Sequence, residues 1–365
     1  MHLYFVGLDV HKQVIAFCVK TAEGGIVVEG SIPATRAALD GWVRTLPGPW
    51  HGAMEATMFS HWIYQHLKPH AAKLEMGHAA RMKAICAGKK KSDKVDARTI
   101  ADLLRCNLFP ACFVISPELG ALRQQMRFRR LLVEETVMFK NKTAGLLMGA
   151  GVEYQRRRLH GKRYFESLVK DNEWIGQELR PLLEFNRAQM VSLQAMDRRL
   201  KGMLARHPAL ESRVRALCRI DGVGTVTALS WALEAVTPER FPSIKHAMSY
   251  CGLTSALRES AGQQKRGPLS KQRNAHLQSV LIETAKLAPM YNQKLKQVHR
   301  KTMEKGGHRN RATLAVARKL VAYLMAADRA FFASQRRDAA AGATDRQAPA
   351  AAGTCVFSGM ADLSR

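Results

Sequence analysis

The chain lacks the cysteine spacing that a structural zinc site or a disulfide framework needs. Its seven cysteines are scattered, with no C-x-x-C pair and an odd total, so we expect free thiols in a reducing compartment. The chain has no run of about 18 apolar residues that could span a bilayer. Its first residues, MHLYFVGLDVHK, lack the basic-then-apolar order of a signal peptide. We therefore expect a cytoplasmic protein without a membrane partner.

Acidic residues are also scarce. The chain has 30 Asp and Glu against 57 Lys and Arg, a formal net charge of +27 over 365 residues. Such an excess favours binding to a polyanion, because each neutralised phosphate releases counterions before any base is read. An anionic membrane surface is the alternative, but nucleic acid is the leading partner, so we expect a protein associated with the nucleoid.

The first 116 residues show the pattern of a mixed α/β domain. Apolar runs at 3–10, 14–20 and 25–30 are separated by tight polar turns, which predicts three antiparallel strands. Two further strands are expected at 50–56 and 71–78, with helices before each of them and from about residue 78 to 105. Three hairpin strands followed by alternating helix and strand are the order of a ribonuclease-H-like sheet.

The rest of the chain is predicted to be helical. Leu193, Met196, Leu200 and Met203 recur at three- and four-residue spacing, which favours a coiled coil or helical hairpin over 117–206, with its turn near Gly149, Ala150 and Gly151. A second compact, mostly helical domain is expected over 207–333. The Ala- and Gly-rich tail, 334–365, has no periodic apolar pattern and is expected to be disordered.

Four carboxylates are placed where a metal site would need them. Asp9 ends the first predicted strand and Glu55 the fourth, while Asp93 and Asp96 lie three residues apart on a predicted helix. That spacing puts two like charges on one helix face, about 5–6 Å apart at their Cβ atoms, which is costly unless a cation lies between them. Together the four carboxylates would suit Mg²⁺, which prefers oxygen ligands and bridges to phosphate in two-ion phosphoryl transfer.

Three of these four carboxylates also have a structural interpretation. Asp9 could be a turn residue, Glu55 could balance the macrodipole of the helix that follows it, and Asp93 next to Ser92 could belong to a helix cap. Asp102, two turns beyond Asp96, is interpreted as an ordinary helix-face residue.

The strings GLDVHK, MEAT and SDKVDARTIADLL, in this order, resemble the DEDD transposases of the insertion-sequence-110 family, which are bridge-RNA-guided recombinases. The resemblance continues through IDGVGTVTALSWALEAV and FPSIKHAMSYCGLT, up to about residue 330. It implies a RuvC-like first domain, with Asp9, Glu55, Asp93 and Asp96 as its acidic tetrad, and a second, transposase domain.

The same resemblance implies a catalytic serine. The family's nucleophile, which forms a covalent link to DNA, lies eight residues after the Gly of GLT, and this position is Ser260. The family usually places Gly next, whereas this chain has Ala261 and then Gly262. By itself, the polar segment from Gly252 to Asn274 predicts an exposed loop between helices that touches phosphate.

Several basic and glycine residues are candidates for contact with nucleic acid. The segment IDGVGTVTA resembles the hairpin of helix-hairpin-helix modules, in which glycines let backbone N–H groups approach a phosphate, although a simple interhelical turn fits it equally well. The basic run around Gly306 and Gly307 predicts two helices that face phosphate or RNA. The candidate residues are Lys89, Lys90, Lys91, Gly222, Gly224, Lys265, Arg266, Lys271 and Arg273.

Three functions remain open at this point. The first is a transposase that cuts and rejoins donor and target DNA through a serine–DNA intermediate; the resemblance adds a noncoding bridge RNA, and exchange between two duplexes would require a dimer or tetramer. The second is a RuvC-like, metal-dependent nuclease or resolvase that uses water and leaves Ser260 idle. The third is a nucleic-acid-binding protein without chemistry, but clustered carboxylates would repel phosphate in such a protein unless metal intervened.

Overall fold

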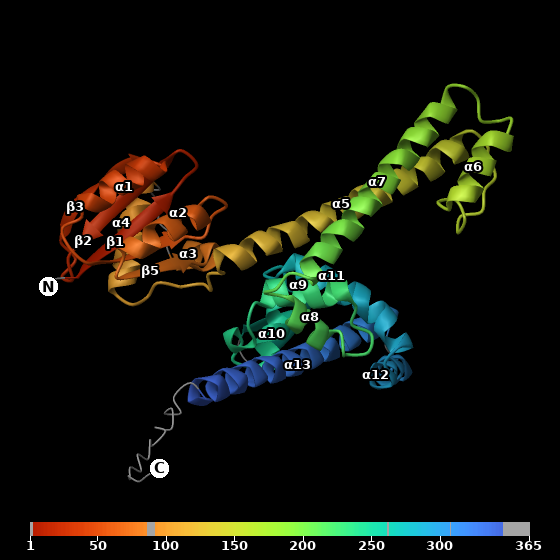
Figure 1. Cartoon of the computed structure of the whole chain (residues 1–365). Helices are drawn as coiled ribbons and strands as arrows, with labels where there is room; N and C mark the ends of the chain where they lie inside the picture. Colours follow the sequence, from red (N-terminus) through yellow and green to blue (C-terminus); the bar gives the residue numbers. More distant parts are fainter. Residues whose placement is uncertain (1–2, 86–91, 261–262, 307, 346–365) are drawn as a thin grey trace, which may run out of the picture. The chain divides into compact units, whose positions relative to one another are not determined.

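The computed structural model describes residues 3–85, 92–260, 263–306 and 308–345. The chain divides into two compact units, residues 1–118 and residues 119–365, and each is described here by itself (Figure 1). Within the described residues, no helix has the length and apolar character that crossing a membrane requires.

The first unit is built on a five-stranded mixed sheet with the order β3-β2-β1-β4-β5. β1 pairs antiparallel with β2, and β2 with β3, whereas β1 pairs parallel with β4, and β4 with β5. The predicted three-stranded meander and the two later strands are therefore confirmed. The strands are β1 (Tyr4–Val10), β2 (Val14–Lys20), β3 (Ile26–Pro33), β4 (Trp50–Glu55) and β5 (Lys73–Gly77).

Helices cover both faces of this sheet. Val6, Leu8 and Val10 of β1 are buried in a core on the side of α1 and α2, whereas Ala53 packs with residues of α3 and α4 on the other side. Thr35 caps α1 and Ser92 caps α4, as each side chain accepts a backbone N–H. The helices are α1 (Arg36–Arg44), α2 (Ser60–Leu67), α3 (Ala79–Ile85) and α4 (Asp93–Arg105).

The second unit begins with a long helical hairpin, α5 (Pro117–Gly149) and α7 (Leu179–Ala205), that runs antiparallel (Figure 1). Arg129 on α5 pairs with Asp197 on α7 at 2.6 Å. Further along, the rings of Phe139 and Phe185 meet edge to face. The turn was predicted at Gly149–Gly151, and α5 ends there, with Gly151 at φ +66°.

The distal end of the hairpin carries a small folded cap that the sequence pattern did not predict. Helix α6 (Lys162–Asp171) and its flanking loops bury Leu159, Phe165 and Val169 against Leu147 and Leu183 of the two long helices. The predicted seam is not confirmed, because Leu193 and Leu200 are only partly buried and Met196 and Met203 are each about half exposed, at 53% and 51%.

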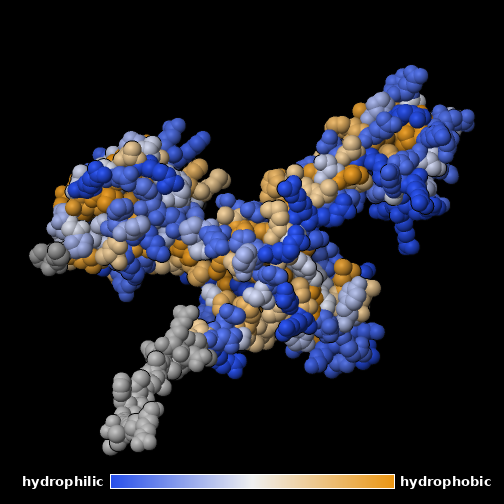
Figure 2. Space-filling model, in the orientation of Figure 1, coloured by the Kyte–Doolittle hydropathy of each residue, from blue (hydrophilic) through white to orange (hydrophobic). Residues whose placement is uncertain are grey.

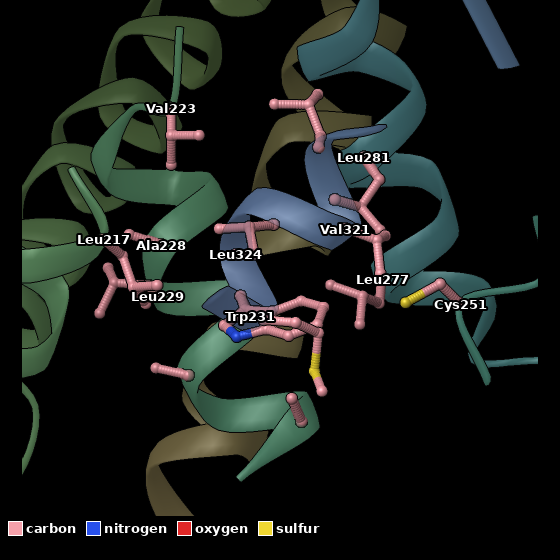
Figure 3. Close-up of a cluster of buried hydrophobic side chains, with 14 of the residues drawn as sticks. Leu217, Val223, Ala228, Leu229, Trp231, Cys251, Leu277, Leu281, Val321 and Leu324 are labelled. Carbon is pink, nitrogen blue, oxygen red and sulfur yellow. The ribbon is translucent and has the colours of Figure 1, made fainter. Parts of the chain in front are cut away.

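The other end of the hairpin joins a helical bundle. Met126 of α5 and Leu204 of α7 belong to the same core as Trp231, which is fully buried, and Val321 (Figure 3). The base of the hairpin and the bundle therefore share one hydrophobic core, which continues across residue 206. The bundle helices are α8 (Glu211–Leu217), α9 (Thr225–Ala235), α10 (Ile244–Tyr250), α11 (Ala275–Leu287), α12 (Gln293–Glu304) and α13 (Arg309–Asp345).

Two predictions for this unit need correction. The polar segment expected to be a loop forms an antiparallel hairpin of β6 (Ser255–Ser260) and β7 (Gln263–Leu269). Its strands contain none of the β-branched and aromatic residues that are typical of strands, so the residue pattern did not predict them. The tail expected to be disordered from residue 334 continues instead as α13 to Asp345, because alanine is the strongest helix former. Residues 346–365 lie outside the described range.

Candidate active site

A glycine allows the helix that carries two carboxylates to lie against the central strand. Gly7 of β1 faces α4, and a Cβ atom at this position would lie 2.0 Å from the carbonyl oxygen of Ala97 and 2.5 Å from the backbone nitrogen of Ala101. Ala16 and Cys18 of β2 are small as well, and both pack against Ala97. Small residues on the sheet therefore bring the backbone of α4 into direct contact with it.

This close contact brings the first turn of α4 to the end of β1. Asp9 lies two residues after Gly7 on the same face of β1, and its side chain is 9% exposed. One ligand atom each from Asp9, His11 and Asp93 lies within 4.8 Å of the others. Burial raises the pKa of Asp9 above its ordinary value; the adjacent His11 lowers it, and the charges of Asp96 and Asp93 raise it further.

The parallel pairing of β1 with β4 brings the fourth carboxylate to the same edge. Leu8 pairs with Met54, so the next residues along the two strands, Asp9 and Glu55, lie on adjacent strands, one residue before the end of β1 and at the end of β4. Side chains alternate along a strand, and Glu55 therefore shares the α4 face with Ala53 and Asp9. The register therefore places Glu55 beside Asp9 at the end of the sheet where α4 begins, but neither Glu55 nor Asp96 belongs to the group of ligand atoms that lie within 4.8 Å of one another.

The cap of α4 shows how the two helix carboxylates are held. Ser92, not Asp93, is the N-cap residue, and its hydroxyl accepts the N–H of Val95 at 3.4 Å. Asp93 and Asp96 both lie in the first turn, where the positive end of the helix dipole stabilises negative charge. The capping role suggested for Asp93 therefore belongs to Ser92. The carboxylate of Asp93 instead lies 3.5 Å from the Nε2 atom of His11.

Asp102, interpreted from the sequence as an ordinary helix-face residue, takes part in an ion pair away from this group. Its carboxylate pairs with the Nζ of Lys20 at 2.5 Å, and Lys20 is almost fully buried. Arg105 lies 3.6 Å from the other carboxylate oxygen. Asp102 therefore serves to neutralise a buried lysine between α4 and β2.

The second unit holds the predicted serine. Ser260 is the last residue of β6 and pairs with Gln263, so it lies at the tip of the β6–β7 hairpin. Ala261 and Gly262 lie outside the described residues, as do Lys89, Lys90 and Lys91. Lys265 and Arg266 occupy β7, whereas Lys271 and Arg273 follow it as exposed residues; the guanidinium of Arg273 donates to the carbonyl of Ser270.

The base of this hairpin is fixed by a buried polar network that sequence analysis missed. Asn274, which follows β7 and caps α11, donates to Glu234 at 2.7 Å and to the Tyr250 hydroxyl at 3.0 Å. Glu234 is 1% exposed, and its two carboxylate oxygens accept hydrogen bonds from Nε and Nη2 of Arg127. The sequence signal that could have indicated this network is Glu234 itself, a single acid within the apolar run LSWALEAV. Burial raises the pKa of Glu234, but Arg127, Asn274 and Arg123 outweigh it and hold the pKa below its ordinary value.

The predicted glycines form the turn between α8 and α9. Gly222 has φ +88°, and a Cβ there would lie 2.9 Å from Ala288, so both the backbone conformation and the space require glycine. Gly224 is the N-cap of α9 and provides no side-chain cap. The turn borders a groove of about 680 Å³ that also includes Arg129 and His276. This arrangement fits both the helix-hairpin-helix interpretation and a plain interhelical turn.

Comparison with known proteins bears on both units. A sequence profile of transposases, the DEDD group of IS110 elements, matches residues 6–151, and a second, for transposases of the IS116/IS110/IS902 family, matches residues 214–323. The first match contains the four carboxylates and the second contains Ser260. The chain belongs to the IS110 family of transposases.

Two further relatives of this transposase agree with the match. A family 20 transposase of Pseudomonas aeruginosa is 26% identical over 297 residues, which cover 78% of this chain and 84% of the relative. The transposase y4qE of Sinorhizobium fredii is 24% identical over 293 residues, covering 77% and 70%. Membership of this family identifies the protein as a DNA-acting enzyme of transposition.

Proposed function

We propose that this transposase cuts and rejoins DNA strands at an acidic centre formed by Asp9, Glu55, Asp93 and Asp96. The observation that carries the proposal is that ligand atoms of Asp9, His11 and Asp93 lie within 4.8 Å of one another. They lie at the end of the sheet where the neighbouring strand, β4, ends in Glu55. The strand order β3-β2-β1-β4-β5 supports a RuvC-like, ribonuclease-H-like assignment of this unit, which is part of the proposal. Carboxylates gathered this closely repel one another unless a cation lies between them, so the donor set fits hard divalent cations.

The four carboxylates would hold those cations, for which Mg²⁺ is the expected choice. Bound there, divalent cations would neutralise phosphate charge and polarise the phosphorus–oxygen bond. The chain itself contributes a closely held Asp9, whose burial disfavours its charge until a cation compensates, and a strongly basic surface that holds the DNA backbone.

Ser260 is the proposed nucleophile. In the first step its Oγ–phosphorus bond would form as a phosphodiester P–O bond breaks, and the hydroxyl proton would pass to a base while the departing DNA oxygen is protonated. In the second, a DNA hydroxyl would give up its proton and attack the same phosphorus, the Oγ–phosphorus bond would break, and the serine oxygen would take up a proton as the new strand is joined. The network of Glu234, Tyr250 and Asn274 supports this assignment, because it fixes both ends of the hairpin that carries Ser260.

Strand exchange between donor and target DNA would require several copies of the chain. The hairpin α5–α7 supports a dimer or tetramer, because apolar side chains remain exposed along it, among them Leu131, Val137, Met138 and Leu182 (Figure 2). Exposed apolar surface of this kind is typical of protein contacts. Guidance by a noncoding bridge RNA and action at the nucleoid in the cytoplasm are part of the same proposal, and the basic charge supports both.

Trapping the covalent intermediate tests the mechanism. The wild-type protein is incubated with its element's DNA ends and Mg²⁺, stopped with SDS, and analysed for a protein–DNA adduct. We expect an adduct that Ser260→Ala and Asp96→Asn each abolish, while Ser255→Ala, an exposed serine in the same strand, retains it. A protein that nicks DNA without any adduct would instead be a nuclease that uses water. An adduct that persists in Ser260→Ala would reject the serine assignment.

A further inference from the structure

His11 lies inside the acidic centre, although no part of the proposed reaction uses it. It follows β1 by one residue, and its backbone N–H donates to Val14 across the tight turn into β2. Its Nε2 atom lies 3.1 Å from a carboxylate oxygen of Asp9 and 3.5 Å from one of Asp93. The ring nitrogen thus lies between two carboxylates that come from different elements of the fold.

These separations are close to those of ligands that share one ion. Neighbouring ligand atoms around an octahedral divalent ion, at about 2.1 Å from the metal, lie about 3 Å apart. His11 Nε2 is at hydrogen-bond distance from Asp9 and 3.5 Å from Asp93, and the three ligand atoms all lie within 4.8 Å of one another, a spacing compatible with three donors to one ion. The remaining positions are left for other carboxylates, water or a phosphate oxygen.

A nitrogen donor changes which cation such a site prefers. Mg²⁺ favours oxygen ligands and keeps its waters, whereas imidazole suits first-row transition metals, whose affinities for mixed nitrogen and oxygen sites rise from Mn²⁺ to Co²⁺ and beyond. A centre made of carboxylates alone would lack this discrimination. His11 would supply it at the ion shared with Asp9 and Asp93.

We propose that His11 is a direct nitrogen ligand of the cation held by Asp9 and Asp93, and that it makes this position prefer transition-metal dications over Mg²⁺. The inference rests on the proposed metal centre and deepens it by naming a fifth ligand. The side chain of His11 is 56% exposed, so its replacement removes a ligand without opening a cavity in the core.

Mn²⁺ is the probe, because its unpaired electrons report on the nuclei bound to it. Pulsed electron paramagnetic resonance of the full-length protein with one equivalent of Mn²⁺ should show coupling to an imidazole ¹⁴N. His11→Ala should lose this coupling, while His70→Ala, an exposed histidine of the same unit, should keep it. By calorimetry, His11→Ala should weaken Mn²⁺ binding about tenfold or more and Mg²⁺ binding less than about threefold.

The outcomes separate this inference from the proposal on which it rests. If Asp9→Asn leaves Mn²⁺ binding unchanged, the metal centre itself is wrong. If Mn²⁺ binds and depends on Asp9 but shows no ¹⁴N coupling, His11 is not a ligand. If His11→Ala strengthens the binding of both cations, the ring acts instead as a positive counter-ion that competes with metal. Either of the last two results overturns the inference and leaves the acidic centre standing.

Discussion

Gly7→Ala is the substitution that most sharply tests how the acidic centre is built. The added Cβ would lie 2.0 Å from the carbonyl oxygen of Ala97, whereas real Cβ atoms keep at least 3.0 Å from such neighbours. The neighbouring atoms belong to the backbone of α4 and cannot rotate away. Relief therefore requires α4 to move away from β1 by about 1 Å, the difference between these two distances.

This displacement should affect both stability and chemistry. Overpacking of a close interface costs about 1–3 kcal/mol, so we expect the free energy of unfolding to fall by that amount. The same shift carries Asp93 and Asp96 away from Asp9. A misplacement of about 1 Å lowers the rate of a catalysed step about 100-fold, and adduct formation should slow by that order while cation affinity falls.

The assay combines urea unfolding, calorimetric titration with Mn²⁺ and the rate of adduct formation. Gly41→Ala is the matched control, because nothing lies within 4 Å of a Cβ at this exposed position in α1. Alanine there should stabilise the helix by about 0.5–1 kcal/mol and leave binding and rate unchanged. If Gly7→Ala behaved like Gly41→Ala in all three measurements, the close packing of α4 would not determine the site.

Three other substitutions probe burial, the hairpin anchor and assembly. Burial raises the pKa of Asp9 above its ordinary value of 3.8. Without metal, stability should therefore fall as the pH rises from 3.8 through the raised pKa, because the folded protein still holds a proton that the unfolded chain has lost. Asp9→Asn should remove this loss in pH-dependent thermal melts, and equal pH profiles for both proteins would contradict it. Glu234→Ala removes a fully buried acceptor that Asn274 and the half-exposed Arg127 share, and should cost about 1–3 kcal/mol in urea unfolding because buried donors lose their partner. Glu283→Ala breaks an exposed pair and should cost less than about 1 kcal/mol; similar costs for the two would show that the network is not a structural anchor. Val137→Lys should reduce the oligomer mass measured by light scattering without lowering the melting temperature, while Glu166→Lys on α6 should not, and an unchanged oligomer in both would remove the long hairpin from the interface.

The sequence predicted the first unit closely because its signals are local. Alternating apolar residues define the strands, and Thr35 and Ser92 mark the starts of two helices with ordinary cap chemistry. The edge of the sheet that gathers Asp9 and Glu55 follows from parallel pairing, which strand order alone suggests. The carboxylates could therefore be named from residue type and position.

What the sequence could not predict depends on contacts between distant segments. Nothing local marks Gly7 as the residue that α4 packs against, or His11 as a neighbour of Asp93. Glu234 reads as one acid in an apolar helix until the partner from α5, 107 residues away, is known. The β6–β7 hairpin was not predicted because its strands are polar and have low strand propensity. They are held together by their antiparallel pairing, which the residue pattern does not show.

Calorimetric titration of divalent cations into single carboxylate variants most directly tests the central claim, that four distant acids form one metal centre. We expect Asp9→Asn, Glu55→Gln, Asp93→Asn and Asp96→Asn each to weaken binding at least about tenfold, as removal of a ligand should. Asp102→Asn, which removes an acid from the same helix that pairs instead with Lys20, should bind cations like the wild type. Equal effects of Asp96→Asn and Asp102→Asn, or wild-type binding by any of the first four variants, would contradict the account.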